Sequence, residues 1–252
     1  MEISDIDGIY STPSWVLEGR LRDDCVTEEL MFPINTDERT CYLRNQEEVR
    51  YVGSWFDQSS SHSCAAWAAA NAGMVLGSIP HLDSIWDLSA RVNEKSSEKR
   101  GLKFSEVMEY VNEDPRMAYG FAKLQIANKE NQRKRDVFTP LQAPTIDFQN
   151  LKARVPLDVF LEEILEQLKL HKPILVSVVS KLFSEEGLQN HALCISGYRI
   201  SNSGQIDLQV LDSARGIYWV PEERIRKSRD FLNDVLIADL KKSEADKNEL
   251  DK

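Results

Sequence analysis

Cysteine is scarce in this chain and irregularly placed. Four cysteines stand among 252 residues, at positions 25, 41, 64 and 194. So few, unevenly spaced cysteines in a chain of this length do not form the disulfide framework of a small secreted protein. No pair of closely spaced cysteines with histidines predicts a zinc site. We therefore expect no metal, no cofactor and a reducing environment.

Long apolar runs and an excess of positive charge are also missing. No apolar stretch approaches the roughly 20 residues needed to cross a bilayer. Residues 1–7 are acidic, whereas a signal peptide would be basic and then apolar. The net charge of −10 argues against nucleic-acid binding, which depends on neutralising phosphates. We expect a cytoplasmic protein without a membrane span, or one exported without a visible N-terminal signal.

The hydrophobic pattern changes along the chain. Helical spacing and Ala-rich composition predict helices at 64–76, 85–92, 103–112 and 157–170. Short apolar runs separated by turn residues predict strands at 173–179, 192–200, 206–211 and 216–220, with 231–240 closing the sheet. A helical first half and a strand-rich second half predict an α+β fold.

The same pattern predicts the domain organisation. Residues 1–50 lack sustained periodicity, so we expect an arm or short strands there, which would serve as a pro-segment or an interaction segment. Residues 51–240 are expected to form the functional domain, with a helical lobe at about 51–145 and a β lobe at about 146–240. The polar residues 241–252 are expected to be a disordered tail.

Cys64 carries the strongest functional signal. It follows Gln58 and a serine-rich loop, and it opens the predicted helix at 64–76. The partial positive charge at a helix N-terminus lowers the pKa of a thiol, and so does a nearby imidazolium. Cys64 is therefore a candidate nucleophile.

His191 and Asp212 are the candidate partners of this thiol. His191 begins one predicted strand and Asp212 ends the next, so a hairpin around Gly204 would bring the two side chains together. A tetrahedral intermediate also needs donors for its oxyanion. The backbone N–H of Cys64 and the side-chain amide of Gln58 are the candidates.

These residues resemble the papain-like cysteine peptidases. The matching features are the glutamine six positions before the cysteine, a tryptophan soon after it, and the later segment Asn-His-Ala followed by Gly197 and Tyr198. Papain is a standard example of a His-paired thiol. The resemblance covers about residues 50–220. It implies a two-lobed fold, a helical lobe and an antiparallel β lobe, with the active site in the cleft between them.

The resemblance also implies roles for single residues. It gives Cys64 as nucleophile, His191 as general base and acid, Asp212 as orienting residue and Gln58 in the oxyanion hole. Gly101, in a segment that resembles the family's Gly-Gly-Leu, is expected on the substrate wall. Asn190, beside the histidine, is expected to contact substrate too.

The chain departs from the family pattern at several positions. Ala65 and Ala66 separate the cysteine from Trp67, and His62 stands where the family has glycine. The usual Asn-Ser-Trp is Asp212-Ser213-Ala214, which removes both the orienting amide and the indole that shields it. Divergent bacterial papain-like peptidases, including secreted effectors and C39-like domains, often carry Asp at this position, so the chain resembles those groups more than the plant or lysosomal enzymes.

The other candidate residues have simpler interpretations. Cys25, Cys41 and Cys194 are expected to be small buried apolar side chains. His62 competes with His191 as the base, although a loop residue just before the nucleophile rarely reaches it with good geometry. Trp67 is expected to pack in the core.

Three functions are compatible with these residues. The first is a cysteine peptidase that acts on a protein or peptide through a Cys64 thioester. The second keeps the thioester but transfers the acyl group or releases ammonia, as transglutaminases, arylamine acetyltransferases and glutamine deamidases do. The third is a papain-like binding module without activity.

Overall fold

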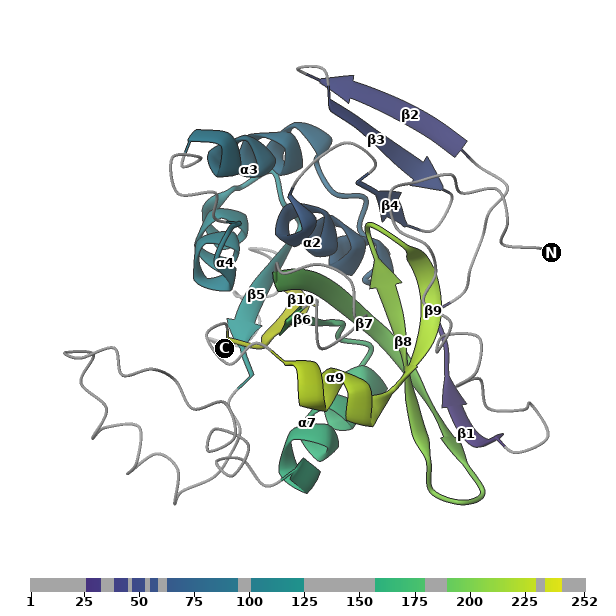
Figure 1. The fold of residues 1–252 in the computed structure, drawn as a ribbon. Coiled ribbons are helices and arrows are strands. Elements are labelled where there is room, and N and C mark those ends of the chain that lie inside the picture. The colour runs from purple at the N-terminus through teal and green to yellow at the C-terminus, as the bar shows by residue number, and fades with distance from the viewer. Residues whose placement is uncertain are drawn as a thin grey trace, which may run out of the picture.

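The computed structural model describes residues 26–32, 39–44, 47–52, 55–58, 63–94, 101–124, 157–179, 190–229 and 234–241. These residues form an α+β fold with two antiparallel sheets. The larger sheet carries helices on both of its faces (Figure 1). The α+β class expected from the sequence is confirmed.

The larger sheet is built around one long strand. Its order is β5 (Tyr119–Lys123), β10 (Leu236–Leu240), β6 (Ile174–Val179), β7 (Asn190–Ser201), β8 (Ile206–Asp212) and β9 (Gly216–Pro221), and β1 (Val26–Leu30) also pairs with β7. The first half of β7 pairs with β6, and its last residues pair with β1 along the same edge. The opposite edge of β7 pairs with β8. β7 therefore connects most of the sheet.

The smaller sheet lies beside the helices that cover one face of the larger one. It has the order β2 (Arg39–Arg44), β3 (Glu47–Val52) and β4 (Phe56–Asp57). β3 crosses the boundary expected at residue 50, so that boundary falls inside a strand. β5 also comes from the expected helical lobe, yet it pairs with β10 at the edge of the larger sheet. The two halves of the sequence therefore share one sheet.

The strands of the larger sheet divide two apolar cores. One core contains α2 (Cys64–Val75), α3 (Leu82–Glu94) and α4 (Phe104–Glu113), and the other contains α7 (Leu157–Lys169) and α9 (Glu222–Ser228). On β7, Ala192 and Cys194 belong to the first core, while Leu193 and Ile195 belong to the second. This alternation follows from the two-residue period of a strand.

Helix α2 is buried on all sides and sets the position of Cys64. Its alanines leave room for close packing against β7, β4 and the neighbouring helices. Trp67 is fully buried, as expected, and its ring meets Trp86 edge-on with centroids 5.1 Å apart. The buried side chain of Asn71 accepts a hydrogen bond from the backbone N–H of Phe56 at 2.6 Å. These contacts fix the helix between the two sheets.

The cysteines outside the site differ in their surroundings. Cys194 is fully buried, as expected. Cys41 is exposed, so the expectation of burial is wrong for it. It lies on the outer strand β2 opposite the exposed Arg50, on the solvent face of the small sheet. Cys25 lies outside the described residues.

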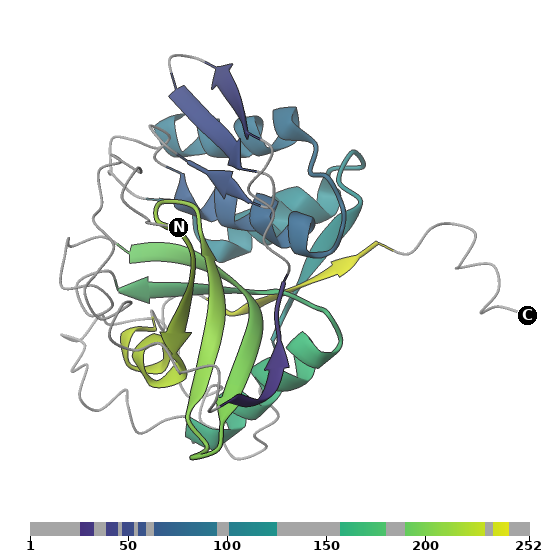
Figure 2. The ribbon, with the colours of Figure 1, turned by 90° about the vertical axis from the view of Figure 1, so that its right-hand side faces the viewer.

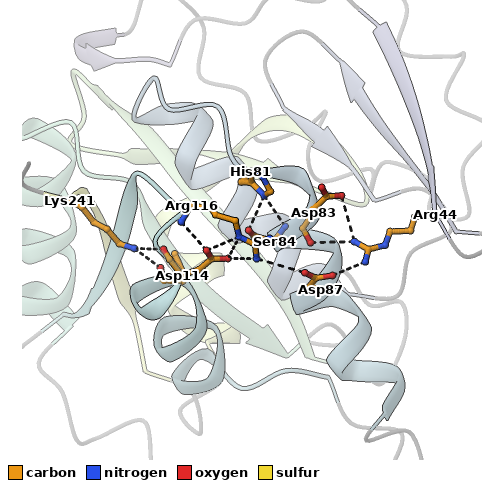
Figure 3. A network of polar contacts seen from close by, with 9 residues as sticks. Arg44, His81, Asp83, Ser84, Asp87, Asp114, Arg116 and Lys241 are labelled. Carbon is orange, nitrogen blue, oxygen red and sulfur yellow. Dashed lines mark hydrogen bonds and ion pairs between the residues drawn. The ribbon is translucent and has the colours of Figure 1, made fainter.

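A polar network ties the helices to both sheets (Figure 3). Arg44 of β2 pairs with Asp87 of α3 at 2.7 Å, and Arg116 pairs with Asp114 at 2.8 Å. The amino group of Lys241 donates to the carbonyls of Val111 and Asp114 at the end of α4. The expected disordered tail therefore does not begin at Lys241, because this residue caps a helix. Residues 242–252 lie outside the described part.

The N-terminal strand is joined to the sheet by more than its ladder of backbone bonds. The side chain of Gln209 accepts a bond from the backbone N–H of Phe32 at 2.8 Å and donates to its carbonyl at 3.2 Å. Figure 2 shows β1 running beside the β7–β8 hairpin. Gly197 follows a bulge in β7, and a Cβ there would stand 2.2 Å from the carbonyl oxygen of Leu30. Glycine at this position lets β1 approach.

Gly197→Ala is expected to destabilise the protein by roughly 2–3 kcal/mol, because the added methyl group overlaps backbone that must shift. Urea unfolding followed by circular dichroism measures the change. Gly101→Ala is the matched control, since among the described residues, chain neighbours aside, no atom lies within 4 Å of a Cβ at that position. The control is expected to stay within about 0.5 kcal/mol of wild type. Equal effects of the two variants would show that β1 does not need the glycine.

Candidate active site

The thiol of Cys64 lies where the start of α2 meets the start of β7. Cys64 is the first residue of the helix and is partly buried. Its sulfur forms hydrogen bonds with the imidazole of His191 and the backbone N–H of Ala192. Ser63 occupies the N-cap position, but its hydroxyl makes no capping bond and has no partner within the described part of the chain. The first backbone N–H groups of the helix therefore lack a capping bond from Ser63, and their partial positive charge lies next to Cys64 and favours its thiolate.

His191 and Asp212 meet across the β7–β8 hairpin. Nε2 of His191 lies 2.7 Å from Oδ1 of Asp212. The hairpin turns at Gly204, which has a φ of 80°. The expectation that this hairpin brings the two side chains together is confirmed. Because Nε2 faces the carboxylate, Nδ1 of the same ring is left for the thiol of Cys64.

The electrostatics of the three groups favour a charged pair. Burial alone lowers the pKa of His191, but the charge and hydrogen bond of Asp212, with a contribution from Cys64, raise it to about 10. Burial raises the pKa of Cys64, but its hydrogen bond to His191 and the charge of that ring outweigh burial and lower it. A lowered thiol pKa beside a raised imidazole pKa is the signature of a thiolate–imidazolium pair.

Asp212 is held by its own turn and by the next strand. It is fully buried. Its Oδ1 accepts a second bond from the backbone N–H of Ala214 at 2.8 Å, and its Oδ2 accepts one from the hydroxyl of Tyr218 at 2.6 Å. Nη1 of Arg215 lies 3.5 Å from Oδ2. Burial raises the pKa of Asp212, but the charge of His191, with Arg215 and Tyr218, lowers it to about 2.

Gln58 is fixed beside the site by two bonds to Ser213. The backbone N–H of Gln58 donates to the carbonyl of Ser213 at 2.7 Å, and the hydroxyl of Ser213 donates to Oε1 of Gln58 at 2.7 Å. Because Oε1 accepts from Ser213, Nε2 is the half of the amide that remains as a donor. Ser213 follows Asp212 directly, so the glutamine is attached to the same turn as the carboxylate.

The remaining candidates stand in different places. Asn190 is exposed, opens β7 next to His191, and pairs with Val179. Gly101 is itself exposed, two residues before the N-cap of α4, and no contact described in the structure joins it to the thiol or the imidazole. The roles of both in substrate binding stay predictions. His62 lies outside the described residues.

Tyr218, Arg215 and Ser213 belong to the site but do not stand out in the sequence. Trp55 also lies near it, because a Cβ on Gly216 would come within 3.7 Å of its ring. Strand alternation places Tyr218 on one face of β9, yet several other aromatic residues also lie on strands. Only the pairing of Asp212 with Gly216 across β8 and β9 shows which tyrosine reaches the carboxylate.

Two further observations concern ligands and membranes. Within the described residues, no three His, Cys, Asp or Glu side chains gather in a way that would hold a metal ion. None of the helices in the described ranges combines the length and apolar character needed to span a bilayer.

Comparisons with known proteins give no family for this chain. Neither the scan against protein-family models nor the search of curated proteins finds a match. The geometry of the site therefore carries the functional argument.

Proposed function

We propose that this protein is a cysteine peptidase that cleaves peptide bonds through a thioester on Cys64. One observation carries the proposal: a continuous series of hydrogen bonds links the thiol to His191 and His191 to the buried Asp212. The series begins at a helix N-terminus, which also favours the thiolate. Nucleophile, base and orienting group thus stand in the order that thiol hydrolysis needs.

The proposed reaction divides into acylation and deacylation. The Cys64 thiolate attacks the carbonyl carbon of the peptide bond and forms a C–S bond. His191, protonated at Nδ1, gives its proton to the leaving amine as the C–N bond breaks. A water molecule then attacks the thioester, His191 takes a proton from it, and the C–S bond breaks to release the carboxylic acid and the thiolate.

The developing oxyanion is stabilised by two donors in this proposal. One is the backbone N–H of Cys64, which belongs to the first helical turn and has no partner within the helix. The other is Nε2 of Gln58, whose amide orientation is set by Ser213. Donors fixed in this way need little reorganisation during the reaction, which is why they lower the barrier.

The arrangement of elements supports a papain-like architecture within this proposal. A helix that carries the nucleophile packs against an antiparallel sheet that carries the histidine and the carboxylate. Helices α2 to α4 correspond to the helical lobe and strands β6 to β9 to the β lobe. The site lies at the junction between them, and we propose that Asn190 and Gly101 line the substrate path there.

Incubation of the protein with a mixture of unstructured peptides, read by mass spectrometry, tests this function. New peptide termini are expected, and they should vanish after alkylation with iodoacetamide that peptide mapping places on Cys64. Mass increases of about 1 Da without cleavage would indicate deamidation instead. Coupling of an added primary amine would indicate acyl transfer. Either result, or cleavage that persists after Cys64 is blocked, would overturn the assignment as a peptidase.

A further inference from the structure

All four contacts described for the carboxylate of Asp212 come from donors. His191 and the N–H of Ala214 face Oδ1, while the hydroxyl of Tyr218 and the guanidinium of Arg215 face Oδ2. The side chains of Asp212 and Arg215 are 0% and 4% exposed, and Tyr218 is 7% exposed. Water therefore has little access to satisfy a mismatched group here.

The direction of the Tyr218 hydroxyl is fixed by its neighbours. Arg215 forms a hydrogen bond with the oxygen of Tyr218, and a guanidinium can only donate. The proton of Tyr218 is then directed to Oδ2 of Asp212, at 2.6 Å. Tyr218, Arg215 and Asp212 thus form a closed set in which the carboxylate is the acceptor.

An asparagine at position 212 would fail in either orientation of its amide. With its NH₂ group toward Tyr218 and Arg215, the amide would place donors against donors. With its NH₂ group toward His191, it would require Nε2 to accept, which leaves the proton of the neutral ring on Nδ1. That tautomer cannot take a proton from Cys64.

We propose that Tyr218 and Arg215 are positioning residues that lock Asp212 as a carboxylate, so that this site requires aspartate rather than asparagine. The link to catalysis rests on the proposed function, because the locked carboxylate supports the His191 imidazolium. The lock itself is a property of the fold. It accounts for Asp at a position where the family that the chain resembles usually has Asn.

A double-mutant cycle on stability tests the lock without any assay of activity. Asp212→Asn is introduced into wild type and into Tyr218→Phe, and the equilibrium constant of unfolding is measured in urea at pH 6. Asp212→Asn raises the equilibrium constant of unfolding by a factor that we call the amide penalty. This factor is expected to be about tenfold smaller in the Tyr218→Phe background than in wild type, because one of the donors that oppose the amide is gone. Equal penalties in the two backgrounds would overturn the lock.

Tyr198→Phe is the matched control background. The hydroxyl of Tyr198 also donates a hydrogen bond to a carboxylate, that of Glu28. Glu28 belongs to β1 and lies away from the site. The full Asp212→Asn penalty is expected in this background. If Tyr218→Phe does not fold, Arg215→Met takes its place in the same cycle, with the same expected reduction and the same overturning result.

Alkylation of Cys64 at pH 6 in the same variants separates the lock from the proposed function. If the thiol is activated, Asp212→Asn is expected to slow labelling by about 30-fold or more in the wild-type background. In the Tyr218→Phe background the same substitution is expected to slow labelling by a factor that is several-fold smaller. Slow labelling of the wild type would contradict the proposed function, while the stability cycle would still decide the lock. Wild type could also be labelled fast while the effects of Asp212→Asn on stability and on labelling are the same with and without Tyr218→Phe. That result would overturn the lock and leave the proposed function intact.

Discussion

Peptide hydrolysis is expected to fall to the uncatalysed level when Cys64 is replaced by alanine. The proposed reaction proceeds through a C–S bond, and no other thiol described near His191 can form it. Alanine suits the first turn of α2, and Cys64 is only partly buried. The free energy of unfolding is therefore expected to change by less than about 1 kcal/mol. Release of amines from peptides, with a thermal melt of each variant, measures both quantities.

Cys41→Ala is the matched control for this variant. Cys41 is a free thiol exposed on β2, in the small sheet. The control is expected to keep full activity, because its sulfur takes no part in the proposed series of hydrogen bonds. Hydrolysis by Cys64→Ala at a rate close to that of the control would rule out the thioester route.

Asp212→Ala is expected to reduce hydrolysis by about 10³-fold or more and also to weaken the fold. The imidazole of His191 loses the acceptor that sets its tautomer, an effect of this order in other triads. The buried groups of Tyr218 and Arg215 lose their acceptor as well, and breaking a buried ion pair from one side costs about 3–5 kcal/mol. Steady-state kinetics on the folded fraction and urea unfolding measure the two effects. Unchanged hydrolysis would show that Asp212 does not orient His191.

The same pair of groups predicts how stability depends on pH. The folded pKa of Asp212 is lowered, so its contribution is present above the unfolded pKa of about 3.9 and is lost as the pH falls toward 2. The folded pKa of His191 is raised, so its contribution is complete below the unfolded value of about 6.5 and is lost as the pH rises toward 10. The pair contributes most between about pH 4 and 6.5. Asp212→Ala is expected to flatten this dependence in urea unfolding measured from pH 3 to pH 10.

Much of the local structure follows from sequence patterns. The helices expected at 64–76, 103–112 and 157–170 match α2, α4 and α7 closely, because apolar spacing and an Ala-rich run are strong local signals. The strands expected at 192–200 and 206–211 match β7 and β8. Their hairpin then required His191 and Asp212 to meet, which is why this part of the site was predictable.

The order of the strands in the larger sheet was not predictable in this way. β10 lies between β5 and β6, and β1 pairs with β7. In each of these pairings the two strands are far apart along the chain. Such pairings depend on the packing of the two cores and not on local pattern. β5 and α9 were not predicted, because β5 contains Gly120, a residue depleted in strands, and α9 has Ile225 as its only apolar residue. Part of the expected helical lobe was consequently found in the sheet.

The surroundings of the carboxylate were also beyond sequence reasoning. Arg215 and Ser213 lie in the turn after Asp212, where polar residues are common and carry no special signal. Tyr218 reaches the carboxylate only because β9 pairs with β8 in one register. The hydrogen bond from the hydroxyl of Ser213 to Oε1 of Gln58 joins residues far apart in the sequence. Contacts of this kind depend on tertiary structure.

The rate of Cys64 alkylation by iodoacetamide as a function of pH is the most direct measurement of a thiolate held by His191. Peptide mapping locates the label on Cys64, and the rate is measured in wild type and in His191→Ala. Fast labelling of the wild type at pH 5–6 is expected, with labelling of the variant rising only near the free-thiol pKa of about 8.5. Two profiles that both rise only near that pKa would contradict an activated thiol and, with it, the assignment of a cysteine peptidase.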